Sequence, residues 1–132
     1  MWTKFMDMHS GGGLKEKWQY IYIEAPEEEA KVIFYNRFGH NPNRVTCTCC
    51  GKDYSINEFK TLKDATAYER GCRWDTKTHK YIEEQNTHSY SKKHITLDEY
   101  KKAKDVLFIY KGDIKPEERE GNLPVQRYVW ID

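Results

Sequence analysis

The spacing of apolar residues along the chain predicts strands interleaved with helices. Apolar and polar residues alternate in part from Trp2 to Met8 and again from Trp18 to Ile23, and this period of two is typical of strands. We expect Trp18, Tyr20 and Tyr22 to share one face of the second strand and Ile21 and Ile23 to share the other. The glycines that separate these two stretches predict a break in regular structure.

Helical spacing begins after Pro26, where three glutamates follow a residue that suits the first turn of a helix. Gly39 is placed to end this helix. The apolar positions that recur at helical spacing before it are Ala30, Ile33, Phe34 and Phe38. Ser55 to Glu58 and Thr96 to Glu99 have the spacing of a capping box and predict two further helices, the first ending near Gly71 and the second near Lys104.

Three more stretches, Arg44 to Cys49, Val106 to Tyr110 and Val125 to Ile131, read as strands. Between Cys72 and Ser91 the chain is polar, with Trp74 and Tyr81 as possible strand anchors. The pattern as a whole predicts an α+β fold: a single domain over residues 1–132, with a mixed or antiparallel sheet and two to three helices. A zinc-knuckle-like turn is a candidate further feature of this fold.

Composition narrows the class of protein. Of 132 residues, 33% are charged, yet 14% are aromatic, and disordered chains are poor in aromatic residues. Lys and Arg number 22 against 21 Asp and Glu, a net charge of +1, which excludes a strongly basic nucleic-acid coat and an acidic tail. We find neither an apolar run long enough to span a membrane nor a signal peptide, so we expect a soluble cytosolic protein without a membrane partner.

Four cysteines form the candidate metal site. Cys47 and Cys50 have Cys-x-x-Cys spacing and precede a glycine, which suits two thiolates turning toward one zinc ion. Cys49 or Cys72 could be a third ligand, and a histidine such as His40, His79, His88 or His94 another. The alternative is that these cysteines are reduced, buried and without metal, as most free cysteines are.

The glycine-rich stretch after the first strand is a candidate ligand site. Successive amides there could form a nest for an anion, and a phosphate-bearing small molecule would suit it, with an aromatic ring stacking on a base. The stretch matches neither the Walker pattern nor the dinucleotide-binding fingerprint, so a simple hairpin-like connection is the favoured interpretation. The candidate residues are His9, Ser10, Gly11, Gly12, Gly13, Lys15, Trp18 and Tyr20.

A basic region in the middle of the chain is the candidate partner-binding segment. From Lys60 to Lys104 there are 11 basic and 7 acidic residues, an excess of +4, whereas the rest of the chain has an excess of −3. Charge and aromatic residues interleave there, as on surfaces that bind single-stranded nucleic acid or an acidic protein, although a solvated face is the plainer interpretation. The candidates are Arg70, Arg73, Trp74, Lys77, Lys80 and Tyr81.

Three stretches together resemble a group of small uncharacterised proteins encoded by tailed bacteriophages. They are Trp2 to Gly13, Phe38 to Tyr54, and the ending Ile114 to Arg119 with Tyr128 to Trp130. The resemblance spans most of the chain and is weakest from Cys72 to Lys93. It implies a phage origin and expression in the cytoplasm of an infected bacterium, and it brings no catalytic residues.

The sequence shows none of the motifs of a nucleophile elbow, a zinc protease or a zinc deaminase, so no catalytic residues are assigned. We expect a non-enzymatic binding protein that counteracts a host defence component, either by blocking an immune protein or by sequestering a nucleotide signal. One alternative is a zinc-supported nucleic-acid-binding accessory protein. Another is a small metal-dependent nuclease or nucleotide hydrolase, with His88 and His94 as its histidines.

Overall fold

The protein is described from a computed structural model in residues 1–8, 16–43, 52–82 and 94–123. A four-stranded sheet has the order β3-β1-β2-β6, in which β1 is antiparallel to both neighbours and β2 and β6 are parallel. These strands are β1 (Trp2–Asp7), β2 (Tyr20–Ile23), β3 (Tyr54–Phe59) and β6 (Val106–Ile109). The helices are α1 (Glu27–Phe38), α2 (Leu62–Thr66) and α3 (Leu97–Tyr100), with two 3-10 turns, η1 (Lys111–Asp113) and η2 (Pro116–Arg119), near the end of the described chain. The fold is therefore α+β with a mixed sheet, as the sequence predicts.

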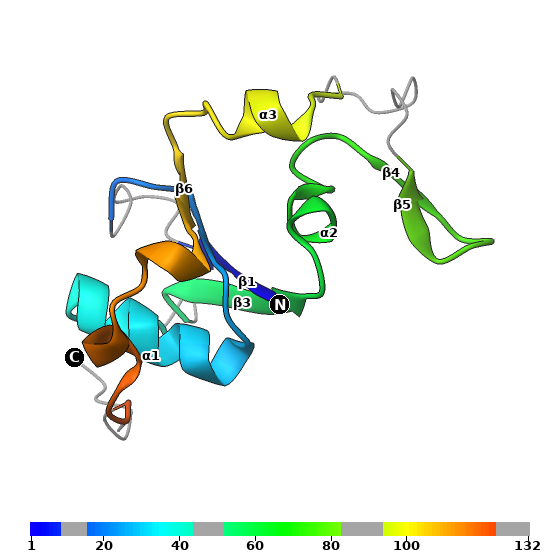
Figure 1. The fold of residues 1–132 in the computed structure, drawn as a ribbon. Helices are drawn as coiled ribbons and strands as arrows, with labels where there is room; N and C mark the ends of the chain where they lie inside the picture. The colour runs from blue at the N-terminus through cyan, green and yellow to red at the C-terminus, as the bar shows by residue number, and fades with distance from the viewer. Residues whose placement is uncertain (9–15, 44–51, 83–93, 124–132) are drawn as a thin grey trace, which may run out of the picture.

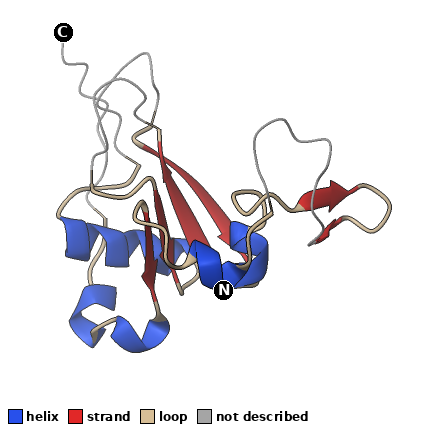
Figure 2. Cartoon of the chain, turned by 90° about the horizontal axis from the view of Figure 1, so that it is seen from above, coloured by secondary structure: helices blue, strands red, loops and turns tan. Residues whose placement is uncertain are grey.

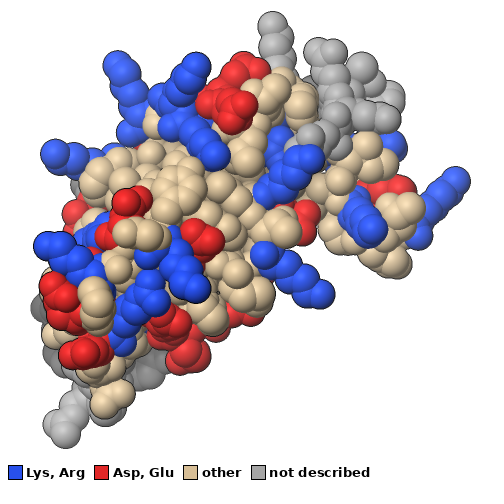
Figure 3. Space-filling model, in the orientation of Figure 1, with Lys and Arg blue, Asp and Glu red and all other residues tan. Residues whose placement is uncertain are grey.

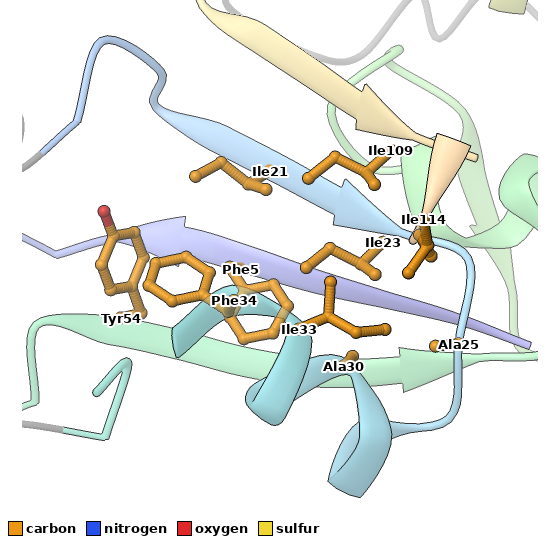
Figure 4. Packing of buried hydrophobic residues seen from close by; sticks show 10 residues of the cluster. All are labelled: Phe5, Ile21, Ile23, Ala25, Ala30, Ile33, Phe34, Tyr54, Ile109 and Ile114. Carbon is orange, nitrogen blue, oxygen red and sulfur yellow. The ribbon is translucent and has the colours of Figure 1, made fainter. Parts of the chain in front are cut away.

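Helix α1 covers one face of the sheet (Figure 1). It begins after Pro26 with three glutamates in its first turn, and it ends at Gly39, whose φ of 80° lies in the left-handed region that glycine adopts without strain. Phe34 stacks on Phe5 of β1 with ring centroids 4.8 Å apart. The buried residues of this layer, drawn in Figure 4, are Phe5, Ile21, Ile23, Ala25, Ala30, Ile33, Phe34, Tyr54, Ile109 and Ile114.

The opposite face of the sheet packs against α2 and α3. Ala65 of α2 and Tyr100 of α3 are buried against Trp2, Tyr22 and Val106. The hydroxyls of Tyr22 and Tyr100 share a hydrogen bond at 2.9 Å, so neither polar group is left unsatisfied in the core. Burial raises the pKa of both tyrosines far above the ordinary value.

A second, two-stranded sheet is formed by β4 (Arg73–Asp75) and β5 (Lys80–Ile82). It follows α2 in the chain and projects away from the four-stranded sheet, as Figures 1 and 2 both show. We call residues 73–82 the β4–β5 hairpin. Most of its residues are exposed to solvent.

Two local predictions were wrong. Ser55 to Glu58 does not cap a helix, because these residues belong to β3, which pairs with β1 along its whole length. The helix begins later, with the Thr61 side chain accepting a hydrogen bond from the Asp64 amide. Trp18 does not share a face with Tyr20, since β2 begins only at Tyr20 and Trp18 packs instead against the cluster on the α1 side.

The other predicted elements have mixed outcomes. The first strand, the helix that ends at Gly39, the capping box at Thr96 and the strand that begins at Val106 are confirmed, and Trp74 and Tyr81 lie in paired strands. The strands predicted for Arg44 to Cys49 and Val125 to Ile131 lie outside the described residues, as does any zinc-knuckle-like turn at the three clustered cysteines.

Candidate functional site

The β4–β5 hairpin is held by the pairing of its strands and by hydrogen bonds within its turn. Its strands pair antiparallel, with Trp74 opposite Tyr81 and Asp75 opposite Lys80. The carboxylate of Asp75 accepts hydrogen bonds from the Thr78 hydroxyl at 2.8 Å and from the Lys77 amide at 3.1 Å. These bonds lower the pKa of Asp75, and the bond from Thr78 has the largest effect. The acidic side chain of the hairpin is thereby committed to holding the turn.

One face of the hairpin is aromatic. Trp74 and Tyr81 are cross-strand neighbours, so their rings lie on the same face, where they meet edge to face with centroids 4.8 Å apart. The His79 ring lies 6.4 Å from that of Trp74. Trp74 is 48% exposed, which is high for a tryptophan. An exposed tryptophan on a projecting hairpin is a candidate contact for a partner.

Basic side chains surround this aromatic pair. Arg73, Lys77 and Lys80 are all exposed, while Asp75 is the only carboxylate between residues 73 and 82. Figure 3 shows Lys and Arg side chains extending from the lobe that the hairpin forms. The structure therefore brings five of the six residues predicted for partner binding onto one small element.

Arg70, the sixth, has a different place. It is only 1% exposed and lies where the chain leaves α2 for the hairpin. Its Nε donates to the Thr66 hydroxyl at 2.9 Å and its Nη2 to the Lys63 carbonyl at 3.2 Å. The Arg70 carbonyl in turn accepts a hydrogen bond from the Ile95 amide at 3.0 Å. Arg70 thus belongs to the base of the hairpin and not to its outer surface.

A hollow of about 80 Å³ lies between the end of α2 and β5. Its lining residues are Lys63, Asp64, Ala67, Arg70 and Tyr81. Sequence reasoning missed this hollow, although Lys63, Ala67 and Arg70 have the spacing that places residues on one side of a helix. Burial is the main cause that raises the pKa of Tyr81, and the negative charge of Glu69 is the second cause. The Tyr81 hydroxyl therefore keeps its proton.

The predicted ligand site is described only at its end. His9 to Gly13 and Lys15 lie outside the described residues. Trp18 is half-buried, with its ring 6.2 Å from that of Phe38. Tyr20 is half-buried on the other side of the sheet, where the Lys4 ammonium lies 5.9 Å from the centre of its ring. Because Trp18 and Tyr20 pack on opposite faces, they do not form one stacking surface.

The predicted metal site is likewise only partly described. Cys47, Cys49 and Cys50 lie outside the described residues, whereas Cys72 is buried at the start of the β4–β5 hairpin, where its amide donates to the Ala67 carbonyl at 2.9 Å. In residues 1–8, 16–43, 52–82 and 94–123, no group of three or more His, Cys, Asp or Glu side chains is placed to hold a metal ion. A zinc site at the cysteine cluster stays a prediction.

A second hollow, of about 260 Å³, lies beside the start of α1. Its charged lining residues are Glu24, Glu29, Lys111 and Arg119. Arg119 lies 3.6 Å from Glu29, and the Lys111 amide donates to Glu24 at 2.9 Å. The hollow is therefore lined by two acidic and two basic side chains.

Within the part of the chain that the structure describes, no helix has the length and apolar character needed to cross a membrane. Comparison with protein-family models, with curated protein sequences and with solved structures finds no match to this chain. The features of the described chain that bear on function are therefore the β4–β5 hairpin and the hollow at its base.

Proposed function

We propose that this chain is a non-enzymatic binding protein that docks onto an acidic protein surface through its β4–β5 hairpin. The observation that carries the proposal is the half-exposed Trp74, supported edge-on by Tyr81 and flanked by basic side chains on an element that projects from the body. Tryptophan, tyrosine and arginine are the residues that most often dominate the energy of protein interfaces.

Charge favours an acidic partner. Arg73, Lys77 and Lys80 are exposed, and Asp75 is the one carboxylate of the hairpin, so basic side chains outnumber acidic ones there by three to one. Complementary charge of this kind accelerates association and selects among partners.

The size of the hairpin favours a protein over a nucleic acid. A single-strand binding surface combines a basic groove with several rings that stack on successive bases. Each strand of the hairpin has three residues, and among its Trp, Tyr and Phe side chains only Trp74 is exposed. The net charge of the whole chain is also only +1, which provides little general attraction for phosphates.

The resemblance to small phage proteins gives the proposal a biological context. In the cytoplasm of an infected bacterium, an inhibitor of this kind would block a host defence protein whose surface is acidic. Sequestration of a nucleotide signal is the other form of the same proposal, and it depends on His9 to Lys15, which lie outside the described residues.

A labelled poly-glutamate peptide with an amidated C-terminus tests the proposal by fluorescence anisotropy. We expect the double variant Lys77→Gln/Lys80→Gln to bind the peptide about tenfold more weakly than the unchanged chain, because two charge contacts are lost. The matched control Lys52→Gln/Lys104→Gln removes two exposed lysines from outside the hairpin and should change the affinity less than twofold.

Two results would count against this function. If the two double variants lose affinity equally, the attraction is a general charge effect and the hairpin is not the docking element. A labelled oligo-dT strand of matched charge gives the second result. If it binds more tightly than poly-glutamate and Lys77→Gln/Lys80→Gln weakens that binding, the hairpin binds nucleic acid and the acidic-protein proposal is wrong.

A further inference from the structure

We propose that the hollow between α2 and β5 accepts a carboxylate group of the partner. This inference rests on the proposed function, which it deepens by naming the group that is recognised. The hollow lies at the base of the β4–β5 hairpin, because Tyr81 of β5 and Arg70 just before the hairpin both line it. It is therefore next to the surface that the proposed function assigns to the partner.

The charges that line the hollow favour an anion. Lys63 and Arg70 contribute two positive charges, and Asp64 contributes one negative charge. The Glu69 carboxylate, which also acts on Tyr81, is paired with the Lys4 ammonium at 2.8 Å. Tyr81 lines the hollow from β5 and has a protonated hydroxyl, a group that donates hydrogen bonds to carboxylates. By contrast, the larger hollow near Arg119 has equal numbers of acidic and basic side chains.

Arg70 is held in place before any ligand arrives. Its guanidinium donates to Thr66 and to the Lys63 carbonyl, and the Thr66 hydroxyl itself donates to the Leu62 carbonyl at 2.8 Å. A guanidinium held by a side-chain hydroxyl and a backbone carbonyl of α2 loses little conformational entropy when it meets an anion. This arrangement is typical of a recognition site built in advance of binding.

The size of the hollow suits a small anion. Its volume of about 80 Å³ is several times the roughly 10–15 Å³ that one water molecule requires. Ala67 contributes only a methyl group to its wall, which leaves the space open. A carboxylate group fits in this volume.

Nuclear magnetic resonance of the full chain, titrated with acetate, tests this inference without a known partner. Acetate should shift the Arg70 Nε–H and Ala67 amide resonances saturably, and acetamide, its neutral isostere, should not. Lys63→Gln should weaken the acetate response at least threefold, and Lys52→Gln should leave it unchanged. In Lys77→Gln/Lys80→Gln the acetate response should persist, because these lysines do not line the hollow.

The outcomes separate the two proposals. If acetate and acetamide act alike at Arg70 and Ala67 while poly-glutamate binding still depends on Lys77 and Lys80, the carboxylate pocket is wrong and the docking function stands. If inorganic phosphate shifts the same resonances at lower concentration than acetate, the hollow is a phosphate site and this inference is overturned. An acetate response that Lys63→Gln weakens supports the pocket even when poly-glutamate does not bind.

Discussion

Lys4 and Glu69 show how single residues connect the sheet to the base of the hairpin. The Lys4 ammonium lies 2.8 Å from a carboxylate oxygen of Glu69, and the two side chains are only 10% and 4% exposed. The ammonium also lies 5.7 Å from the centre of the Phe59 ring and 5.9 Å from that of Tyr20, which adds cation–π attraction. Glu69 immediately precedes Arg70, so this pair fixes the chain where the binding surface begins.

Breaking this pair should be strongly destabilising. We expect Lys4→Met to lower the free energy of unfolding by about 3–5 kcal/mol, because it leaves the Glu69 carboxylate buried without its cation. Urea denaturation measures the change. The double variant Lys4→Met/Glu69→Leu should recover most of the loss, since no buried charge remains. As a control, Lys31→Gln removes the ion pairs with Glu27 and with the exposed Glu28 on the surface of α1 and should cost less than about 1 kcal/mol. A loss of similar size in both single variants would contradict the buried pair.

At the scale of elements, α1 holds the end of the described chain. The Arg37 guanidinium donates to both carboxylate oxygens of Glu118, from Nε at 2.8 Å and from Nη2 at 2.9 Å. The Asn36 amide donates to the carbonyls of Glu118 and Glu120. The hydrogen bond from Arg37 is the main cause that lowers the pKa of Glu118 to about 2. These contacts tie η2 to the last turn of α1.

The Arg37–Glu118 pair adds to the free energy of unfolding, and this addition is lost in acid. The pKa of Glu118 is lower in the folded chain than its usual 4.5, so the unfolded chain binds the extra proton first. The stabilisation from the Arg37–Glu118 pair should be complete above about pH 4.5, and it should be lost as the pH falls toward 2. We expect Glu118→Gln to cost less than about 1 kcal/mol at neutral pH, because the pair is near solvent, and nothing near pH 2. Urea unfolding of both proteins at the two pH values checks this, and a cost that does not change with pH would refute it.

The elements also show what local sequence can and cannot predict. α1 was predictable because its acidic first turn, its apolar spacing and Gly39 all indicate the same helix. Ser55 to Glu58 misled because a capping-box spacing is short and also fits a strand, and the pairing of β3 with β1, distant in the chain, decides between them.

The candidate site was predictable only in part, for the same reason. The interleaved basic and aromatic residues from Arg73 to Tyr81 identified the surface, because hairpin strands keep their side chains near one another. The burial of Arg70 and the hollow beside it depend on how the end of α2 packs against β5. No local pattern carries that information, since it arises from contacts across the fold.

At the scale of the whole molecule, the layers and the hairpin have separate roles. The sheet, with α1 on one face and α2 and α3 on the other, buries the aromatic residues that the composition indicated. The β4–β5 hairpin stands apart from these layers and presents Trp74 with its basic neighbours (Figures 1 and 3). The near-neutral charge of the chain therefore conceals a local basic surface, and this surface is the centre of the proposed function.

The most direct measurement of this claim follows the tryptophan indole N–H resonances of the full chain as amidated poly-glutamate is added. We predict a saturable shift of the Trp74 resonance, with the resonances of Trp2 and Trp18 unmoved, because Trp2 is buried and Trp18 packs beside Phe38. Both serve as internal controls in the same sample. A Trp74 resonance that stays unmoved while Trp2 or Trp18 shifts would contradict docking through the β4–β5 hairpin.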